Sequence, residues 1–118
     1  MEFERILKEL TGRAGANGAI MLAKDGEVVA CHTDRAGLDI DLIGAHHGVI
    51  LDIIRDASAR SDFKDIKSVS ITTDTNRLAI STLKDGYYIV LSMDKALPIG
   101  RALYESDRAA KMLEEEMG

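Results

Sequence analysis

Apolar residues at the start of the chain follow a helical spacing. Phe3, Ile6, Leu7 and Leu10 stand at i, i+3, i+4 and i+7, which places them on one face of an α-helix. Gly12 follows two residues later, and glycine weakens a helix interior. We therefore expect a short amphipathic helix that ends near Gly12.

Further along, short apolar runs bounded by turn residues predict strands. They cover residues 19–23, 28–31, 66–73, 78–83 and 87–91. An Asp-Gly pair separates the first two runs at Lys24-Asp25-Gly26, and another separates the last two at Lys84-Asp85-Gly86. Asp-Gly favours a tight hairpin in which both turn residues take a positive φ. We expect two such hairpins.

The segment 38–57 carries more apolar surface than one helix face requires. Wound as a helix, its large apolar side chains cover roughly 220°, whereas an ordinary surface helix shows a stripe a little over ~100° wide. One stripe consists of Leu38, Leu42, Val49 and Ile53, and the other consists of Ile40, Ile43, Ile50, Leu51 and Ile54. One stripe can face the chain's own sheet. Because a chain of 118 residues has few other elements, we expect the other stripe to contact a second copy.

The last element is a predicted helix that begins near Pro98. Proline suits the first turn of a helix, where its missing N–H costs nothing. The sequence ends in the acidic run 114–116, which the helix dipole disfavours at a C-terminus, so we expect that end to fray. The predicted order of elements is α-β-β-α-β-β-β-α in a single domain over residues 1–118.

Composition narrows the possible functions. The chain has 20 Asp and Glu against 15 Lys and Arg, which argues against nucleic acid or an anionic membrane as the main ligand. No apolar run approaches the roughly 20 residues of a membrane span. The N-terminus lacks the basic and apolar regions of a signal peptide, and the lone Cys31 fits a reducing compartment, so a cytoplasmic location is expected.

Candidate chemistry is sparse. Nucleophile elbows, phosphate-binding loops, dinucleotide fingerprints and paired zinc cysteines are all missing, so we predict no catalytic residue and no cofactor. The soft ligand types are Cys31, His32, His46 and His47, and the adjacent histidines would point about 100° apart on a helix, so no metal site is predicted. If His47 lies within a buried stripe, its protonation would weaken an interface near pH 6.

The polar arc of the predicted 38–57 helix and the charged residues of the chain allow more than one interpretation. Asp41, Gly44, Gly48, Asp52 and Arg55 share the arc of the 38–57 helix that the large apolar residues leave free. This arc is either a contact for a partner protein or a tolerated exposed face. Among the arginines, Arg13, Arg35 and Arg77 are expected on loops or turns, and none is singled out as an arginine finger. The aspartates around the helix are interpreted as dipole-complementing or solvated groups.

The element order, the length and the paired Asp-Gly turns together resemble the roadblock (dynein light chain) domain family, which is close to the longin domains. The resemblance covers almost the whole chain, and it includes Pro98-Ile99-Gly100-Arg101-Ala102-Leu103 and the meander around Lys84-Asp85-Gly86-Tyr87. The family's closing helix has alanine before arginine, and here the arginine comes first.

The resemblance implies an α+β sandwich with a five-stranded antiparallel sheet, the long helix on one face and the terminal helices on the other. It also implies dimers in which the long helices pack antiparallel and the following strand joins its symmetry mate. The strand over 66–73 lacks proline and has only Lys67 as an inner charge, so it would be an undefended edge unless paired. The predicted dimer interface comprises Leu42, Ile43, His46, His47, Val49, Ile50, Ile53, Ile54, Lys67, Val69 and Ile71.

The resemblance further implies a non-catalytic module that binds and regulates a small Ras-like GTPase, either as an activator or as a scaffold. An alternative is a small-ligand sensor, which should line a pocket with polar groups among aromatics. Only five aromatic side chains are available for this, which counts against it. A hydrolase or transferase is disfavoured because no nucleophile–base pair is evident.

Overall fold

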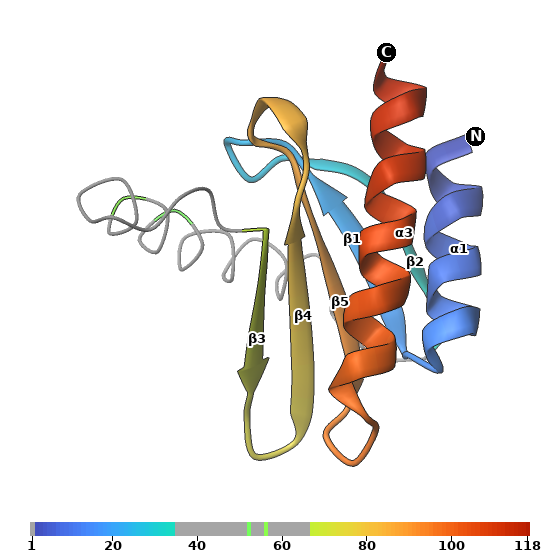
Figure 1. Cartoon of the computed structure of the whole chain (residues 1–118), viewed down its shortest axis with the longest axis vertical. Helices are drawn as coiled ribbons and strands as arrows, with labels where there is room; N and C mark the ends of the chain where they lie inside the picture. Colours follow the sequence, from blue (N-terminus) through green and yellow to red (C-terminus); the bar gives the residue numbers. More distant parts are fainter. Residues whose placement is uncertain (1, 35–51, 53–55, 57–66) are drawn as a thin grey trace.

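A computed structural model describes residues 2–34, 52, 56 and 67–118 of the chain (Figure 1). The helices are α1 (Glu2–Ala14) and α3 (Ile99–Met117). The strands are β1 (Gly18–Leu22), β2 (Val28–Thr33), β3 (Ser68–Thr72), β4 (Asn76–Thr82) and β5 (Tyr88–Asp94), and a short turn, η1 (Lys84–Gly86), connects β4 to β5. The order of these elements matches the prediction, with strand limits that differ by a few residues.

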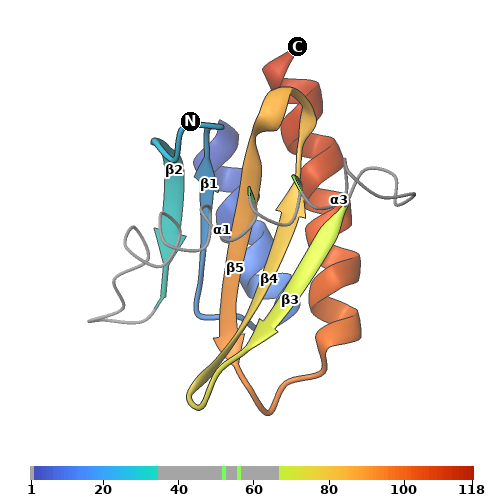
Figure 2. The ribbon, with the colours of Figure 1, turned by 90° about the vertical axis from the view of Figure 1, so that its left-hand side faces the viewer.

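The strands form one five-stranded antiparallel sheet with the order β2-β1-β5-β4-β3. The first and last strands of the structure, β1 and β5, therefore pair at its centre, while β2 and β3 lie at the two edges (Figure 2). The predicted five-stranded antiparallel sheet is confirmed. The predicted helix over 38–57 lies outside the described residues, apart from Asp52 and Asp56, which are helical and exposed.

Helices α1 and α3 run in opposite directions side by side on one face of the sheet, which we call the helix face (Figure 1). The apolar residues that predicted α1 fill the core there, since Ile6, Leu7 and Leu10 are all buried. From the sheet, alternate residues of β1, β4 and β5 point into the same core. They include Ala19, Met21, Ala79, Ile89, Leu91 and Met93. The terminal helices thus share one face, as the family resemblance implies.

The other face of the sheet, the second face, is also apolar. Its buried cluster consists of Ile20, Leu22, Leu78, Ile80, Tyr88 and Val90. These residues alternate along their strands with those of the helix face, because successive side chains of a strand point to opposite sides. A sheet that is apolar on both faces needs a cover on each, and α1 and α3 provide only one.

The two Asp-Gly turns differ in conformation. In the β4–β5 turn, Asp85 and Gly86 both have positive φ, at 60° and 81°, and Tyr87 donates its N–H to the Lys84 carbonyl. This is the predicted type I′ geometry. In the β1–β2 turn only Gly26 has a positive φ, at 88°, so that prediction was wrong for Asp25. A longer loop with an irregularity at Met21/Leu22 lets the aspartate keep a negative φ.

The helix ends also differ from expectation. Helix α1 continues through Gly12 to Ala14, and the positive φ of 69° falls on Gly15. Gly12 is tolerated because buried Leu10 and Thr11 hold the last turn against the sheet. Helix α3 continues through its acidic end to Met117. Leu113 is fully buried there, and the Glu114 carboxylate accepts a 2.7 Å hydrogen bond from the backbone N–H of Lys84.

Candidate dimer interface

The predicted interface strand is an edge strand. Among the described strands none lies beyond β3, which pairs with β4 along one side only. Its five residues contain no proline and no charged side chain, and the exposed Lys67 precedes them directly. Natural edges are usually protected by charges, bulges or proline, so β3 is an unprotected edge.

The register with β4 determines which backbone groups of β3 form hydrogen bonds to that strand and which do not. Thr82 donates its N–H to the Lys67 carbonyl at 2.9 Å, and Thr73 donates its N–H to the Asn76 carbonyl at 2.8 Å. Since backbone groups alternate in direction along an antiparallel pair, the odd-numbered residues of β3 bond to β4. The N–H and C=O groups of Ser68, Ser70 and Thr72 therefore point away from the sheet.

The side chains of β3 also alternate. Val69 and Ile71 are half-buried against the second-face cluster, where they lie opposite Ile80 and Leu78 of β4. Ser68, Ser70 and Thr72 are exposed on the helix face. The predicted residues Val69 and Ile71 thus lie on the second face of β3. Sequence reasoning did not select the three hydroxyl residues that carry the outward backbone groups, although the period of two in this strand was the available signal.

The remaining predicted interface residues lie outside the described residues. They are Leu42, Ile43, His46, His47, Val49, Ile50, Ile53 and Ile54. The candidate partner-contact residues Asp41, Gly44, Gly48 and Arg55 lie outside them as well. Both sets stay predictions from the sequence.

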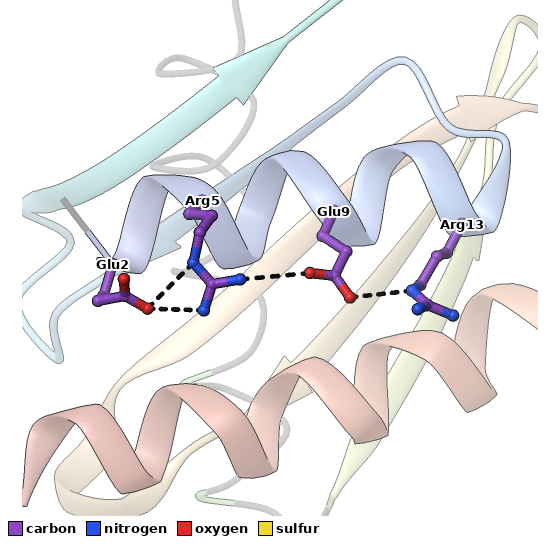
Figure 3. A network of polar contacts seen from close by, with 4 residues as sticks. All are labelled: Glu2, Arg5, Glu9 and Arg13. Atoms are coloured by element: carbon purple, nitrogen blue, oxygen red, sulfur yellow. Dashed lines mark hydrogen bonds and ion pairs between the residues drawn. The ribbon is translucent and has the colours of Figure 1, made fainter.

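Of the three arginines expected on loops, Arg35 lies outside the described residues, and the other two are in regular elements instead. Arg13 lies in the last turn of α1, where its guanidinium forms an ion pair with Glu9 at 3.0 Å (Figure 3). Arg77 lies in β4 and donates to the Thr72 hydroxyl and to the Leu97 carbonyl. Arg77 thus ties the edge strand and the loop before α3 to the sheet, a structural role that its neighbours in sequence do not reveal.

Other candidate chemistry in the described part of the chain is limited. His32 lies 2.8 Å from the Asp34 carboxylate on the β2 edge, and Cys31 is exposed nearby. Within residues 2–34, 52, 56 and 67–118, no three histidine, cysteine or acidic side chains gather as metal ligands would. In the same residues, neither helix has the length and apolar character that crossing a membrane requires.

Comparison with known proteins shows the fold. No protein-family model matches the chain, and no curated protein matches it in sequence. Among solved structures, MglB of Myxococcus xanthus superposes with a TM-score of 0.89 at 11% identity, covering 99% of this chain and 95% of that one. A roadblock/LC7 domain from Streptomyces avermitilis gives 0.85 at 21% identity, covering 97% and 96%. An MglB structure described as having a tetrameric arrangement gives 0.86 at 16% identity, covering 97% and 86%.

These superpositions extend over nearly the full length of the chain and of its neighbours. The chain therefore has a roadblock-like fold, as the sequence resemblance implies. Sequence identities of 11–21% show the fold alone, because one fold can carry unrelated functions.

Proposed function

We propose that this chain is a single roadblock-like domain that forms a homodimer through β3, and that the dimer binds and regulates a small Ras-like GTPase without catalytic residues of its own. The dimer part of this proposal rests on the unprotected edge of β3. The roadblock-like fold supports the GTPase part, through the resemblance of the chain to a family of GTPase-binding proteins. An MglB neighbour with a tetrameric arrangement also supports self-association in this fold.

The outward backbone groups specify a register for the paired strands. In a two-fold antiparallel pair, outward-pointing residues must face one another to exchange hydrogen bonds. Centring the pair on Ser70 places Ser70 opposite Ser70 of the second copy and Ser68 opposite its Thr72. All three outward residues then have partners. If one strand is shifted by two residues along the other, one of the three has no partner within β3. We propose the register centred on Ser70.

Blocking one outward N–H tests the dimer. Ser70→Pro removes an N–H that does not bond to β4, and proline is tolerated on edge strands where its nitrogen faces outward. We expect this variant to be monomeric by light scattering, while Ser70→Ala, which keeps the N–H, stays dimeric. A folded Ser70→Pro variant with the mass of a dimer would contradict pairing through β3.

Cysteine cross-linking tests the register. Residues that face each other in a hydrogen-bonded pair have Cα atoms about 5.5 Å apart, which a disulfide can bridge. In a Cys31→Ser background, Ser70→Cys should cross-link the dimer under mild oxidation. Ser68→Cys is the matched control, because two copies of residue 68 would lie about 13 Å apart along the strands. Cross-linking at Ser68 and not at Ser70 would refute this register.

Nucleotide-dependent binding tests the GTPase part. The immobilised wild-type dimer is offered purified Ras-like GTPases encoded near it in its genome, each loaded with GDP or with a non-hydrolysable GTP analogue. Preferential capture of one nucleotide state is expected, because a regulator must bind the two states with different affinities. Phosphate release with and without the dimer then separates an activator from a scaffold. If none of these GTPases binds in either state, the assignment fails, whatever the oligomeric state.

A further inference from the structure

One arginine connects the edge strand β3 to the loop that precedes α3. The half-buried Arg77 of β4 donates from Nε to the Thr72 hydroxyl at 3.2 Å and from Nη1 to the Leu97 carbonyl at 3.1 Å. Thr72 is the last residue of β3, and Leu97 lies in the loop between β5 and α3. A single guanidinium therefore holds two segments that are far apart in the sequence.

The strand pairing explains why Arg77 reaches both segments. Arg77 is the cross-strand partner of Thr72 in β3 and of Met93 in β5. Cross-strand partners lie on the same face of a sheet, and Met93 is fully buried in the core of the helix face. Leu97 packs against this core as well. The end of β3 and the loop thus meet Arg77 on the helix face.

The loop is closed by its own hydrogen bonds. The Asp94 carboxylate accepts the Ala96 N–H at 2.9 Å, and the Asp94 carbonyl accepts the Leu97 N–H at 3.1 Å. Asp94, Lys95 and Ala96 are all exposed. Because exposed loops open locally at a low cost in free energy, the bond from Arg77 to the Leu97 carbonyl restrains this loop from the sheet.

Thr72 also belongs to the proposed dimer edge. Its hydroxyl accepts the bond from Arg77, and its outward N–H and C=O face Ser68 of the second copy in the register centred on Ser70. Pairing would therefore hold Thr72 from both sides. An arginine side chain loses much conformational entropy when it is ordered, and both of its bonds order the same side chain. A firmer bond to Thr72 thus lowers the entropic cost of the bond to Leu97.

We propose that Arg77 is a positioning residue that couples pairing at β3 to the loop over residues 94–98. Dimer formation restrains the loop, and restraint of the loop strengthens the dimer by the same factor, because coupling between two sites is reciprocal. This inference rests on the dimer of the proposed function and adds to it a connection to the start of α3.

Amide hydrogen exchange at Leu97 tests the coupling. Exchange rates are measured by NMR in the wild-type dimer and in the Ser70→Pro variant. The Leu97 amide should exchange at least about fivefold more slowly in the dimer, which is the lower end of ordinary coupling between sites. The control is the Gly26 amide, which donates to the Ala23 carbonyl in the β1–β2 turn and should exchange equally in both. In a dilution series of the wild type, the Leu97 rate should follow the dimer fraction measured by light scattering.

Variants of Thr72 and Arg77 test the route. Thr72→Val removes the acceptor of the Arg77 bond but keeps a β-branched side chain and the outward backbone groups. It should remain dimeric and lose the dependence of Leu97 exchange on the dimer. Thr72→Ser is the matched control, because it keeps the hydroxyl, and it should retain this dependence. Arg77→Gln should lose it, and thermal melts check that each variant is folded.

The possible outcomes separate this inference from the dimer itself. Equal Leu97 exchange in the wild-type dimer and in the monomer would overturn the coupling and leave the dimer intact. A dependence that persists in Thr72→Val would show that it does not pass through Arg77, and would overturn the positioning role. If light scattering finds the wild type monomeric at every concentration, the dimer proposal fails and this inference fails with it.

Discussion

Helices α1 and α3 lie side by side on the same face of the sheet, yet their charges are ordered oppositely with respect to their own dipoles. Helix α1 has Glu2 and Glu4 in its first turn and Arg13 in its last, which is the stabilising order. Helix α3 has no acidic residue in its first turn and no basic residue in its last, and it ends in an acidic run. The ends of the two helices therefore depend on different kinds of interaction.

Local interactions support α1. Its exposed face carries the ladder Glu2–Arg5–Glu9–Arg13, joined by ion pairs at i, i+3 and i, i+4 spacing (Figure 3). Helix α3 also has such local ion pairs, Glu105–Arg108 and Asp107–Lys111, but the tertiary structure supports its acidic end: Leu113 lies in the core and Glu114 contacts the β4–β5 turn.

Shortening a buried leucine should cause the largest loss of stability, and the loss should be similar in the two helices. Leu7 of α1 and Leu113 of α3 are both fully buried. Replacing either with alanine should lower the free energy of unfolding by about 2–5 kcal/mol, because a cavity replaces packed methyl groups. Urea unfolding measures both. A loss below about 1 kcal/mol for Leu113→Ala alone would show that the end of α3 is not held by the core.

Removing a buried hydroxyl should change the free energy of unfolding in opposite directions in the two helices. Thr11 of α1 donates to the Leu7 carbonyl at 2.8 Å, whereas the buried Ser106 hydroxyl of α3 has no hydrogen-bond partner among the residues that the structure describes. Ser106→Ala should therefore raise the free energy of unfolding by about 1–2 kcal/mol, and Thr11→Val should lower it by about 1 kcal/mol. Thermal and urea unfolding of both variants provide the measurement, and destabilisation by Ser106→Ala would contradict the assignment of an unsatisfied group.

Replacing each of two neighbouring glutamates at the end of α3 should also change the stability in opposite directions. Glu114→Ala removes the hydrogen bond to Lys84 and should cost about 1 kcal/mol, since the loss of a charged acceptor outweighs the relief of the helix dipole. Glu115→Ala removes an exposed charge that the dipole disfavours and should stabilise by a few tenths of a kcal/mol, about 0.3. Unfolding midpoints of the pair, measured in one buffer, compare them directly. Equal effects would mean that Glu114 has no special role.

The ion ladder of α1 should have the smallest effect. The hydrogen bond and charge of Arg5 lower the pKa of the Glu2 carboxyl below its ordinary value. The folded state therefore gains stability from ionised Glu2 above the ordinary carboxyl pKa and loses that gain as the pH falls through the lowered value. Glu2→Gln should reduce the unfolding midpoint slightly at neutral pH, and the difference should vanish in strong acid or high salt. A difference that grows in acid would contradict this sign.

The sequence by itself determined the order of the elements and their apolar faces. Periodic apolar residues such as Ile6, Leu7 and Leu10 can be identified along the chain because helix and strand repeats are local properties. The same alternation and the absence of proline over 68–72 identified β3 as an unprotected strand, and the resemblance placed it at an interface. Local rules also correctly assigned positive φ to Asp85 and Gly86.

Only the tertiary structure decided the features that depend on residues far apart in the chain. The hydrogen-bond register with β4 selected Ser68, Ser70 and Thr72 as the outward residues of β3. Glu114 reached Lys84 across 30 positions and kept the acidic end of α3 helical, against the local dipole rule. Both features follow from how the strands pair and how α3 crosses the sheet, which no local sequence spacing specifies.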